Sequence, residues 1–317
     1  MSKIAFVFPG QGSQKVGMGR SFSEQFALAK SLFDQANQIL GFDLEKLCFE
    51  GPEETLKQTE NAQPALFAVS VIAWSCLQSK WDGQPSVVAG HSVGEYAALV
   101  AAGVLTFSDG LKLVRKRGEL MAIEAKRRPG SMTAILGLEA KDALEACMQA
   151  KLELNSLVTV ANYNGGGQIV ISGETRAVER AAEIAKEKGA KKVIPLPVSG
   201  GFHSPLMVAA GDALYEQLKQ TTMRIPQIPI VINVTADYAR HPDDLLGGLT
   251  MQVSRSVRWE ESMQRLLADG IDTFIELGSG DVLGGLMRRI DKSARTISVS
   301  DSRTLGVACD LLNGASS

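Results

Sequence analysis

The 317-residue sequence is long enough for one large domain or for two unequal ones, and its 45% hydrophobic and 21% charged residues are typical of a globular protein with a large core. A net charge of −2 gives no electrostatic footprint for nucleic acid, and four scattered cysteines without metal-ligand spacing favour a reduced, cytoplasmic setting with no metal site. We find no secretory signal and no apolar run of the roughly 18 residues that a membrane helix needs.

Short apolar strands alternate with longer helical patterns in the first part of the chain. The predicted elements are strands at 3–8 and 87–89 and helices at 22–40, 63–80 and 96–102. Gly41 and Gly103 end two of these helices, and Pro64 lies in the first turn of the third. This alternation predicts a parallel sheet covered by helices.

A different order of elements begins at Pro129. A strand, a helix, two strands, a helix and a strand follow one another at 132–138, 141–150, 158–162, 168–172, 176–188 and 192–196. This order predicts a ferredoxin-like unit, and Pro129, Pro195 and Pro197 bound it as expected of an inserted subdomain.

The first pattern returns after Pro197. The predicted elements are a helix from Pro205, strands at 228–233, 273–276 and 296–299, and helices at 259–268 and 282–290. We therefore predict a large α/β domain made of residues 1–128 and 197–317, with a small domain of residues 129–196 inserted into it.

The segment Gly90-His91-Ser92-Val93-Gly94 places a serine between a predicted strand and a predicted helix. This pattern is typical of a nucleophile elbow, in which a strained turn exposes the hydroxyl and leaves no room for a Cβ two residues before or after it. The N–H of Val93, at the start of the helix, is then placed to stabilise an oxyanion. The pentapeptide alone is weak evidence, because a chain with 31 glycines can contain it by chance.

A serine hydroxyl becomes nucleophilic only when a base takes its proton, and the chain has three histidines. His91 adjoins Ser92 and is expected to point away from it, while His241 lies in a polar loop. His203 lies in a small-residue loop just before the helix that starts at Pro205, which makes it the expected base. The alternative is a histidine that only caps this helix.

Two further segments bear on the substrate. The glycine-rich residues 8–14 lack the lysine of a phosphate-binding loop, so we interpret them as a plain turn or as the source of a second oxyanion N–H. Arg117 falls on the apolar face of the helical segment 111–121, where a guanidinium needs an anion. That anion is either a substrate carboxylate or a core Asp or Glu in a structural ion pair.

Together these segments resemble the bacterial malonyl-CoA:acyl carrier protein transacylases. The resemblance is carried, in the family's order, by FVFPGQGSQ, AGHSVGEYAAL, VRKRGELM, GSMTAILGL, VANYNGGGQIVISG, VSGGFHSPLM, MQVSRSVRW and IELGSGDVLGGLMRRI. These blocks span nearly the whole chain. The family implies an α/β-hydrolase-like large domain with an inserted ferredoxin-like domain.

The resemblance also implies residue roles. Ser92 matches the family's nucleophile, His203 its general base and Arg117 the clamp for the malonyl carboxylate. The two oxyanion N–H donors and the backbone carbonyl that orients the histidine correspond to Gln11, Val93 and Gln252. The substrate pocket is expected to include Met121, Asn162 and Phe202, whose bulk would crowd an α-methyl branch.

The implied reaction carries a malonyl group from malonyl-CoA to the phosphopantetheine thiol of acyl carrier protein through a malonyl-serine, without a cofactor. Ser279 and Asp281 depart from the family pattern, in which many members have Pro and Lys, and Asp281 removes a positive charge from the expected mouth. The basic residues left for an acidic carrier protein are Lys191, Lys192, Arg288 and Arg289, each of which is also explained as an ordinary solvated charge.

Three other functions compete with this reading. An esterase or thioesterase uses the same elbow, but such enzymes place a late histidine after the serine, and none follows His241. A non-catalytic subunit that binds the carrier protein does not need Ser92, His203 and Arg117 together. A trans-acting polyketide acyltransferase shares the chemistry and differs in the pathway it serves.

Overall fold

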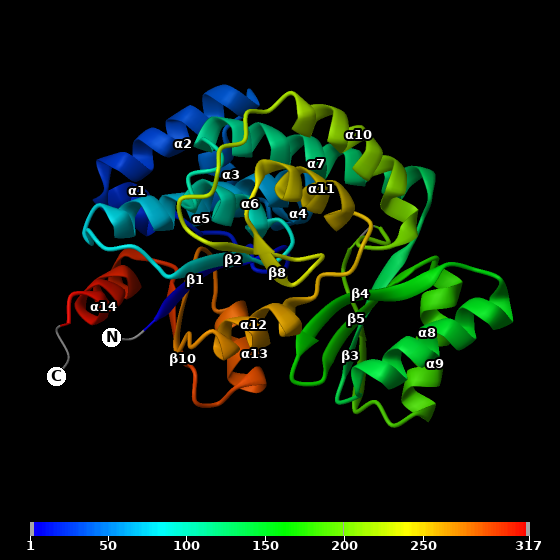
Figure 1. Ribbon diagram of the computed structural model, residues 1–317. Helices are drawn as coiled ribbons and strands as arrows, with labels where there is room; N and C mark the ends of the chain where they lie inside the picture. Colours follow the sequence, from blue (N-terminus) through cyan, green and yellow to red (C-terminus); the bar gives the residue numbers. More distant parts are fainter. Residues whose placement is uncertain (1–2, 199, 315–317) are drawn as a thin grey trace.

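The computed structural model describes residues 3–198 and 200–314 and contains two β-sheets (Figure 1). The six strands of the larger sheet lie in the order β10 (Arg295–Val299), β9 (Thr273–Leu277), β1 (Ile4–Phe8), β2 (Val87–Gly90), β7 (Ile230–Ile232) and β8 (Asp237–Ala239). Neighbouring strands are parallel except for β7 and β8. The prediction of an α/β fold with a mostly parallel sheet is confirmed.

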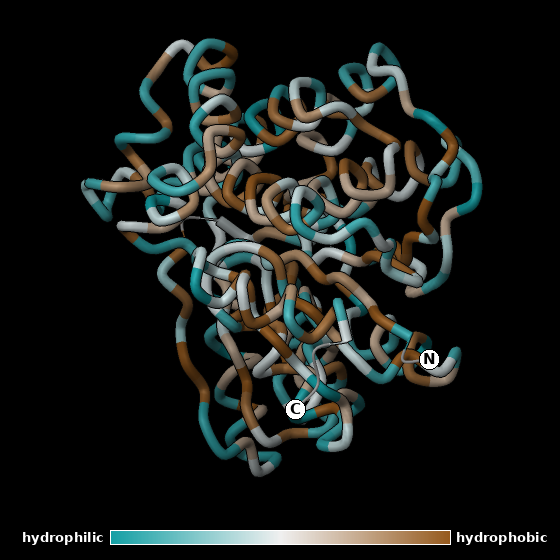
Figure 2. Tube along the Cα trace, turned by 90° about the vertical axis from the view of Figure 1, so that its left-hand side faces the viewer, coloured by the Kyte–Doolittle hydropathy of each residue, from teal (hydrophilic) through white to brown (hydrophobic). Residues whose placement is uncertain are grey.

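Helices cover both faces of this sheet because its strands are apolar on both sides. In β1, Ala5 and Val7 face one core cluster, and Phe6 and Phe8 face the other. The first cluster is closed by α12 (Trp259–Ala268) and α13 (Val282–Ile290), drawn below the sheet in Figure 1. The second is closed by α2 (Ala27–Leu40), α5 (Thr59–Gln78), α6 (Gly94–Ala101), α7 (Phe107–Arg127), α10 (Val208–Lys219) and α11 (Pro242–Gln252). Figure 2 shows hydrophobic segments through the middle of the molecule and hydrophilic ones over much of its periphery.

The smaller sheet is antiparallel and lies to one side of the larger one (Figure 1). Its elements follow the chain as β3 (Ser131–Leu136), α8 (Ala140–Leu154), β4 (Val158–Gly165), β5 (Gln168–Gly173), α9 (Thr175–Glu187) and β6 (Lys192–Pro195), with the sheet order β4-β5-β3-β6. Alternate residues of β5 face opposite sides of this sheet. Ile169 and Ile171 pack under α8 and α9, while Gln168 and Val170 line a pocket shared with the larger unit.

Two predicted helix boundaries were wrong. The predicted helix 22–40 is two helices, α1 (Arg20–Gln25) and α2, because Phe26 between them has extended backbone angles of φ −126° and ψ 114°. Helix α5 begins at Thr59, so Pro64 lies beyond its first turn. Proline lacks the N–H that would bond to the carbonyl of Glu60. The guanidinium of Arg115 donates to that carbonyl instead, at 2.8 Å.

Several short or polar elements escaped prediction. They are α3 (Leu44–Glu50), α4 (Glu53–Lys57), β8, α11 and α14 (Ser302–Leu312). His241, expected within a loop, is exposed and immediately precedes α11, whose first residue is Pro242. The predicted helix from Pro205 starts as a short 3-10 turn, η1 (Pro205–Met207), before α10 begins at Val208.

Candidate active site

Ser92 stands at a sharp turn between β2 and α6. Its φ is +52°, a left-handed conformation that non-glycine residues rarely adopt. A Cβ at Gly90 would lie 2.1 Å from the backbone of Gly94, and one at Gly94 would lie 2.1 Å from the carbonyl oxygen of Phe8. The two glycines are therefore required by close backbone contacts, which is the geometry expected of a nucleophile elbow.

His203 reaches the serine from the loop before η1. Its Nε2 lies 2.8 Å from Ser92 Oγ, and its Nδ1 lies 2.7 Å from the backbone carbonyl oxygen of Gln252. Because a carbonyl only accepts, Nδ1 carries the proton and Nε2 is left free to accept one from the serine. Burial, together with the charge of Arg117, lowers the pKa of His203 to about 3, so the ring is neutral at physiological pH.

Arg117 projects from α7 into the same site and is 1% exposed. Its Nη2 donates to Ser92 Oγ at 3.0 Å and to Gln252 Oε1 at 2.9 Å, and its Nη1 donates to Gln63 Oε1 at 2.6 Å. Within residues 3–198 and 200–314, no carboxylate forms an ion pair with it. The structural ion pair considered as an alternative is thus not found, and the guanidinium faces the serine.

Of the two expected oxyanion donors, Gln11 lines the pocket with Ser92, and its side-chain oxygen accepts a hydrogen bond from Thr59 Oγ1 at 2.9 Å. Val93 directly follows the serine, has a buried side chain and precedes α6. The loop that carries Gln11 is tied down where Ser279 Oγ donates to the carbonyl of Ser13 at 2.6 Å.

These groups open into a pocket of about 450 Å³ between the two sheets. Met121, Asn162 and Phe202, the three other residues expected to contact substrate, all line it. Further apolar wall comes from the smaller sheet, through Met132 and Val170. One wall therefore comes from each unit, which is a common place for a substrate site.

The cations expected at a carrier surface differ in where they lie. Arg289 is exposed near the pocket and donates to Gln168, one of its lining residues, at 2.6 Å. Arg288 turns the other way, to Thr296 on β10 at 2.9 Å and to Asp281 at 3.5 Å. Lys191 and Lys192 are exposed at the start of β6 and do not line the pocket. Sequence reasoning missed Lys57, which lines it and pairs with Glu53 at 2.7 Å.

Sequence reasoning also missed the amides that hold the site. Asn233, directly after β7, accepts from the N–H of Ser92 at 2.7 Å and donates to the carbonyl of Gly90 at 2.6 Å. Its own N–H donates to Glu95 at 2.7 Å. A polar residue at the carboxyl end of a predicted parallel strand was the available signal for Asn233. For Gln63, within the helix α5, no comparable signal exists.

His91 is the second histidine near the serine, and as expected it points elsewhere. Its Nε2 lies 2.9 Å from Asn164 Oδ1, and its ring meets Trp259 edge-on at 5.5 Å.

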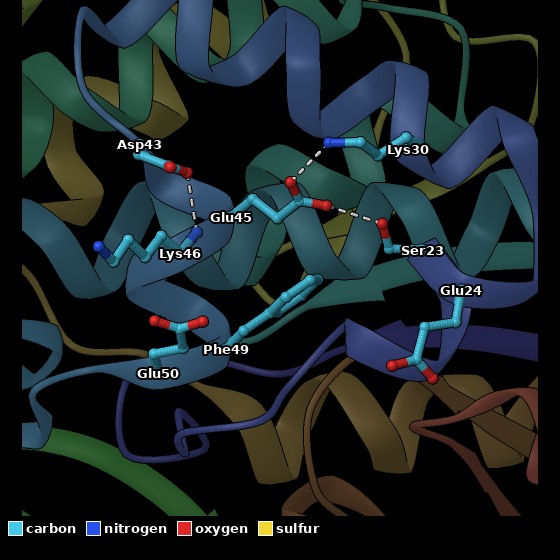
Figure 3. Close-up of a pocket in the computed structure, with 8 residues that line it drawn as sticks. All are labelled: Ser23, Glu24, Lys30, Asp43, Glu45, Lys46, Phe49 and Glu50. Atoms are coloured by element: carbon cyan, nitrogen blue, oxygen red, sulfur yellow. Dashed lines mark hydrogen bonds and ion pairs between the residues drawn. The ribbon is translucent and has the colours of Figure 1, made fainter.

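A second, more open pocket of about 490 Å³ lies beside α1, α2 and α3 (Figure 3). Part of its charge is paired, because Glu45 accepts from Lys30 and from Ser23, each at 2.7 Å. No cluster of potential metal ligands and no helix able to cross a membrane occurs in the described parts of the chain.

Known proteins are similar to this chain in sequence and in architecture. Residues 5–302 match the acyl transferase domain family. The malonyl CoA-acyl carrier protein transacylase of Bacillus subtilis is 47% identical over 313 residues, covering 98% of each chain. That of Escherichia coli K12 is 38% identical over 311 residues, covering 98% of this chain and all of its own.

Solved structures agree with these relatives. An acyl carrier protein S-malonyltransferase from Vibrio cholerae superimposes with a TM-score of 0.93 at 44% identity, covering 97% of this chain and 100% of that one. A malonyl-transacylase bound to its type II polyketide synthase acyl carrier protein superimposes with a TM-score of 0.95 at 39% identity, covering 98% and 100%.

Proposed function

Because the chain belongs to the acyl transferase domain family, we propose that it transfers a malonyl group from malonyl-CoA to the phosphopantetheine thiol of acyl carrier protein. One observation carries the proposal. A buried serine hydroxyl contacts a neutral imidazole at 2.8 Å and a guanidinium at 3.0 Å. The site therefore pairs an activated nucleophile with a cation suited to an acyl group that ends in a carboxylate.

The first half of the reaction forms a malonyl-serine. Ser92 Oγ attacks the thioester carbonyl while its proton passes to His203 Nε2. The backbone N–H groups of Gln11 and Val93 stabilise the oxyanion, and Arg117 holds the far carboxylate. When the carbon–sulfur bond breaks, the proton on His203 moves to the departing CoA sulfur.

The second half runs the same steps in reverse. The carrier's thiol gives its proton to His203 and attacks the malonyl ester, and Ser92 leaves with that proton returned to it. The carbonyl of Gln252 orients the imidazole throughout, a task that a carboxylate performs in Ser-His-Asp triads. These residues complete both halves with protons and acyl groups alone, so the proposed reaction uses no cofactor.

The pocket walls support a preference for an unbranched acyl group. Phe202 is buried beside His203 and lines the pocket, so its ring is placed to crowd an α-methyl branch. Met121 and Asn162 complete the wall on the substrate side. Arg289 is the basic residue best placed to meet an acidic carrier protein, because it bonds to a lining residue. Lys191, Lys192 and Arg288 do not line the pocket and are the weaker candidates.

The finer description of the fold belongs to this proposal. Residues 1–128 and 197–317 would form an α/β-hydrolase-like domain, supported by the parallel strands and the elbow after β2. Residues 129–196 would form a ferredoxin-like domain, supported by the βαββαβ order and the sheet order β4-β5-β3-β6. The four free cysteines are consistent with a cytoplasmic setting.

Intact-mass measurement after adding malonyl-CoA alone tests the proposal. The chain should gain the mass of one malonyl group, and Ser92→Ala should gain none. Adding carrier protein should then discharge the malonyl group onto the carrier. Rapid loss of the group to water without a thiol would instead support a hydrolase, and no gain of mass would overturn the proposal.

The clamp is tested separately. Arg117→Ala should reduce malonyl transfer by about 100-fold and leave acetyl transfer unchanged. The reason is that the malonyl group ends in a carboxylate that Arg117 binds, whereas the acetyl group has none. Equal losses for both acyl groups would contradict the assigned role.

A further inference from the structure

The partners of Arg117 are all uncharged. Its guanidinium donates to two side-chain amides, Gln63 and Gln252, and to the hydroxyl of Ser92. Buried guanidinium groups are usually matched by a carboxylate, because an uncompensated charge is costly away from water. This cation is held in place by neutral acceptors instead.

The orientation of the Gln63 amide is fixed by its neighbours. Gln63 is fully buried, and its Nε2 donates to Thr59 Oγ1 at 3.0 Å and contacts Met121 Sδ at 3.4 Å. Both of those atoms accept, so the amide nitrogen must face them and the amide oxygen must face Arg117. Thr59 in turn donates to Gln11, so the chain of bonds runs from the guanidinium to the proposed oxyanion loop.

The buried carboxyl group of Glu95 influences the charge of Arg117, although no ion pair forms between the two groups in the described parts of the chain. Burial lowers the pKa of Arg117, and the charge of Glu95, which is buried on α6, opposes that shift. Its carboxylate is occupied by the N–H of Asn233 at 2.7 Å. Burial also raises the pKa of Glu95 to about 7, so it carries only part of a negative charge near neutral pH.

We propose that Gln63 is a specificity-determining residue, whose neutral amide fixes the guanidinium of Arg117 without neutralising it and so reserves that charge for the carboxylate of the acyl group. The inference rests on the proposed function and assigns the malonyl preference to a residue on α5 as well as to Arg117 itself. A carboxylate at position 63 would have nearly the same shape and would stand 2.6 Å from Nη1. It would form the ion pair that the site now lacks.

The experiment compares malonyl-serine and acetyl-serine formation in three variants. Gln63→Glu should lower kcat/KM for malonyl-CoA by about 100-fold and leave acetyl-CoA within about threefold, because the new charge repels the substrate carboxylate and occupies its partner. Gln63→Met removes the acceptor and adds no charge. It should lower the malonyl-to-acetyl ratio by about tenfold, less than Gln63→Glu, because the guanidinium keeps its charge but loses the amide that fixes it. Gln58→Glu places the same charge on an exposed residue just before α5 and should alter neither rate.

The outcomes separate this inference from the proposed function. Absence of any malonyl-serine in the unchanged chain would overturn the proposed function itself. With the unchanged chain active, an unaltered malonyl-to-acetyl ratio in Gln63→Glu would overturn the role of Gln63. If that variant does not fold, Gln63→Met still decides the matter, because an unaltered malonyl-to-acetyl ratio without the amide would overturn the role of Gln63 and a reduced ratio would support it.

Discussion

Charged side chains have opposite surroundings at the floor of the pocket, around Ser92, and at its mouth. On the floor, the cation of Arg117 is buried and has only neutral contacts. At the mouth, charges are exposed and some are paired with opposite charges, as in Glu53–Lys57 at 2.7 Å, with Asp281–Arg288 at 3.5 Å just beyond the lining residue Val282.

Exposed pairs of this kind add little stability, because water and salt screen them. A buried charge without a counter-ion interacts far more strongly with any anion that reaches it. The sequence contains arginines in both regions, and only their surroundings distinguish a substrate clamp from a solvated surface group. Substitutions should therefore have effects that decrease from floor to mouth.

The largest effect is expected at His203. His203→Ala removes the only imidazole in contact with Ser92 Oγ within the described residues, and should slow malonyl-serine formation by about 1,000-fold. His91→Ala is the matched control, because His91 is adjacent in sequence but bonds to Asn164. It should change the rate less than about tenfold. Rapid mixing with malonyl-CoA and mass detection measure both rates, and similar losses in the two variants would refute the assignment.

The next largest effect is expected at Asn233, which bonds to the backbone of the turn at Ser92. Asn233→Ala leaves the N–H of Ser92 and the carbonyl of Gly90 without their buried partner, which should cost about 2 kcal/mol. Because the strained turn is then less well held, acylation should slow by about 30-fold. Urea unfolding and acylation rates measure the two effects, with Asn164→Ala as a control outside the turn. A less stable protein that acylates at the normal rate would show that Asn233 is only structural.

The pH dependence of the acylation rate tests whether burial at the floor of the pocket keeps His203 neutral. For a histidine with its ordinary pKa of about 6.5, the neutral fraction that can accept a proton falls about tenfold between about pH 7.5 and about pH 5.5. Because burial and Arg117 lower the pKa of His203 to about 3, its ring stays neutral above that value and acylation should vary less than about twofold over this range. Glu95, whose pKa is about 7, titrates within the range, so Glu95→Gln serves as the control. An acid limb centred near pH 6.5 in both proteins would contradict the geometry.

The smallest effect is expected at the mouth. Asp281→Lys removes the ion pair with Arg288 and adds positive charge near the pocket entrance. The KM for an acidic carrier protein should fall about threefold at low salt and return toward its original value at high salt, while acylation by malonyl-CoA is unchanged. A larger effect on the first half-reaction than on the second would show that Asp281 belongs to the floor rather than to the mouth.

Local patterns in the sequence predicted much of this architecture. The elbow could be placed at Ser92 because a buried strand, two glycines and a helix are adjacent in the chain. The βαββαβ order was readable for the same reason, although the boundaries moved by several residues. The break at Phe26 was not readable, because Phe26 packs against a core cluster assembled from distant parts of the chain. The strand β8 pairs with β7 just before it, but its three residues, Asp237–Ala239, are too few to show an apolar pattern.

The sequence by itself determined the turn that exposes the hydroxyl and the residue types available to serve it. Only the tertiary structure decided that Asn233 spans that turn and that the acceptors around Arg117 are neutral amides. The physical reason is one of range. Backbone conformation follows from neighbouring residues, whereas the energy of a charge depends on every group and every water molecule around it. Those neighbours come from positions as far apart as 63, 117 and 252, which only the folded chain brings together.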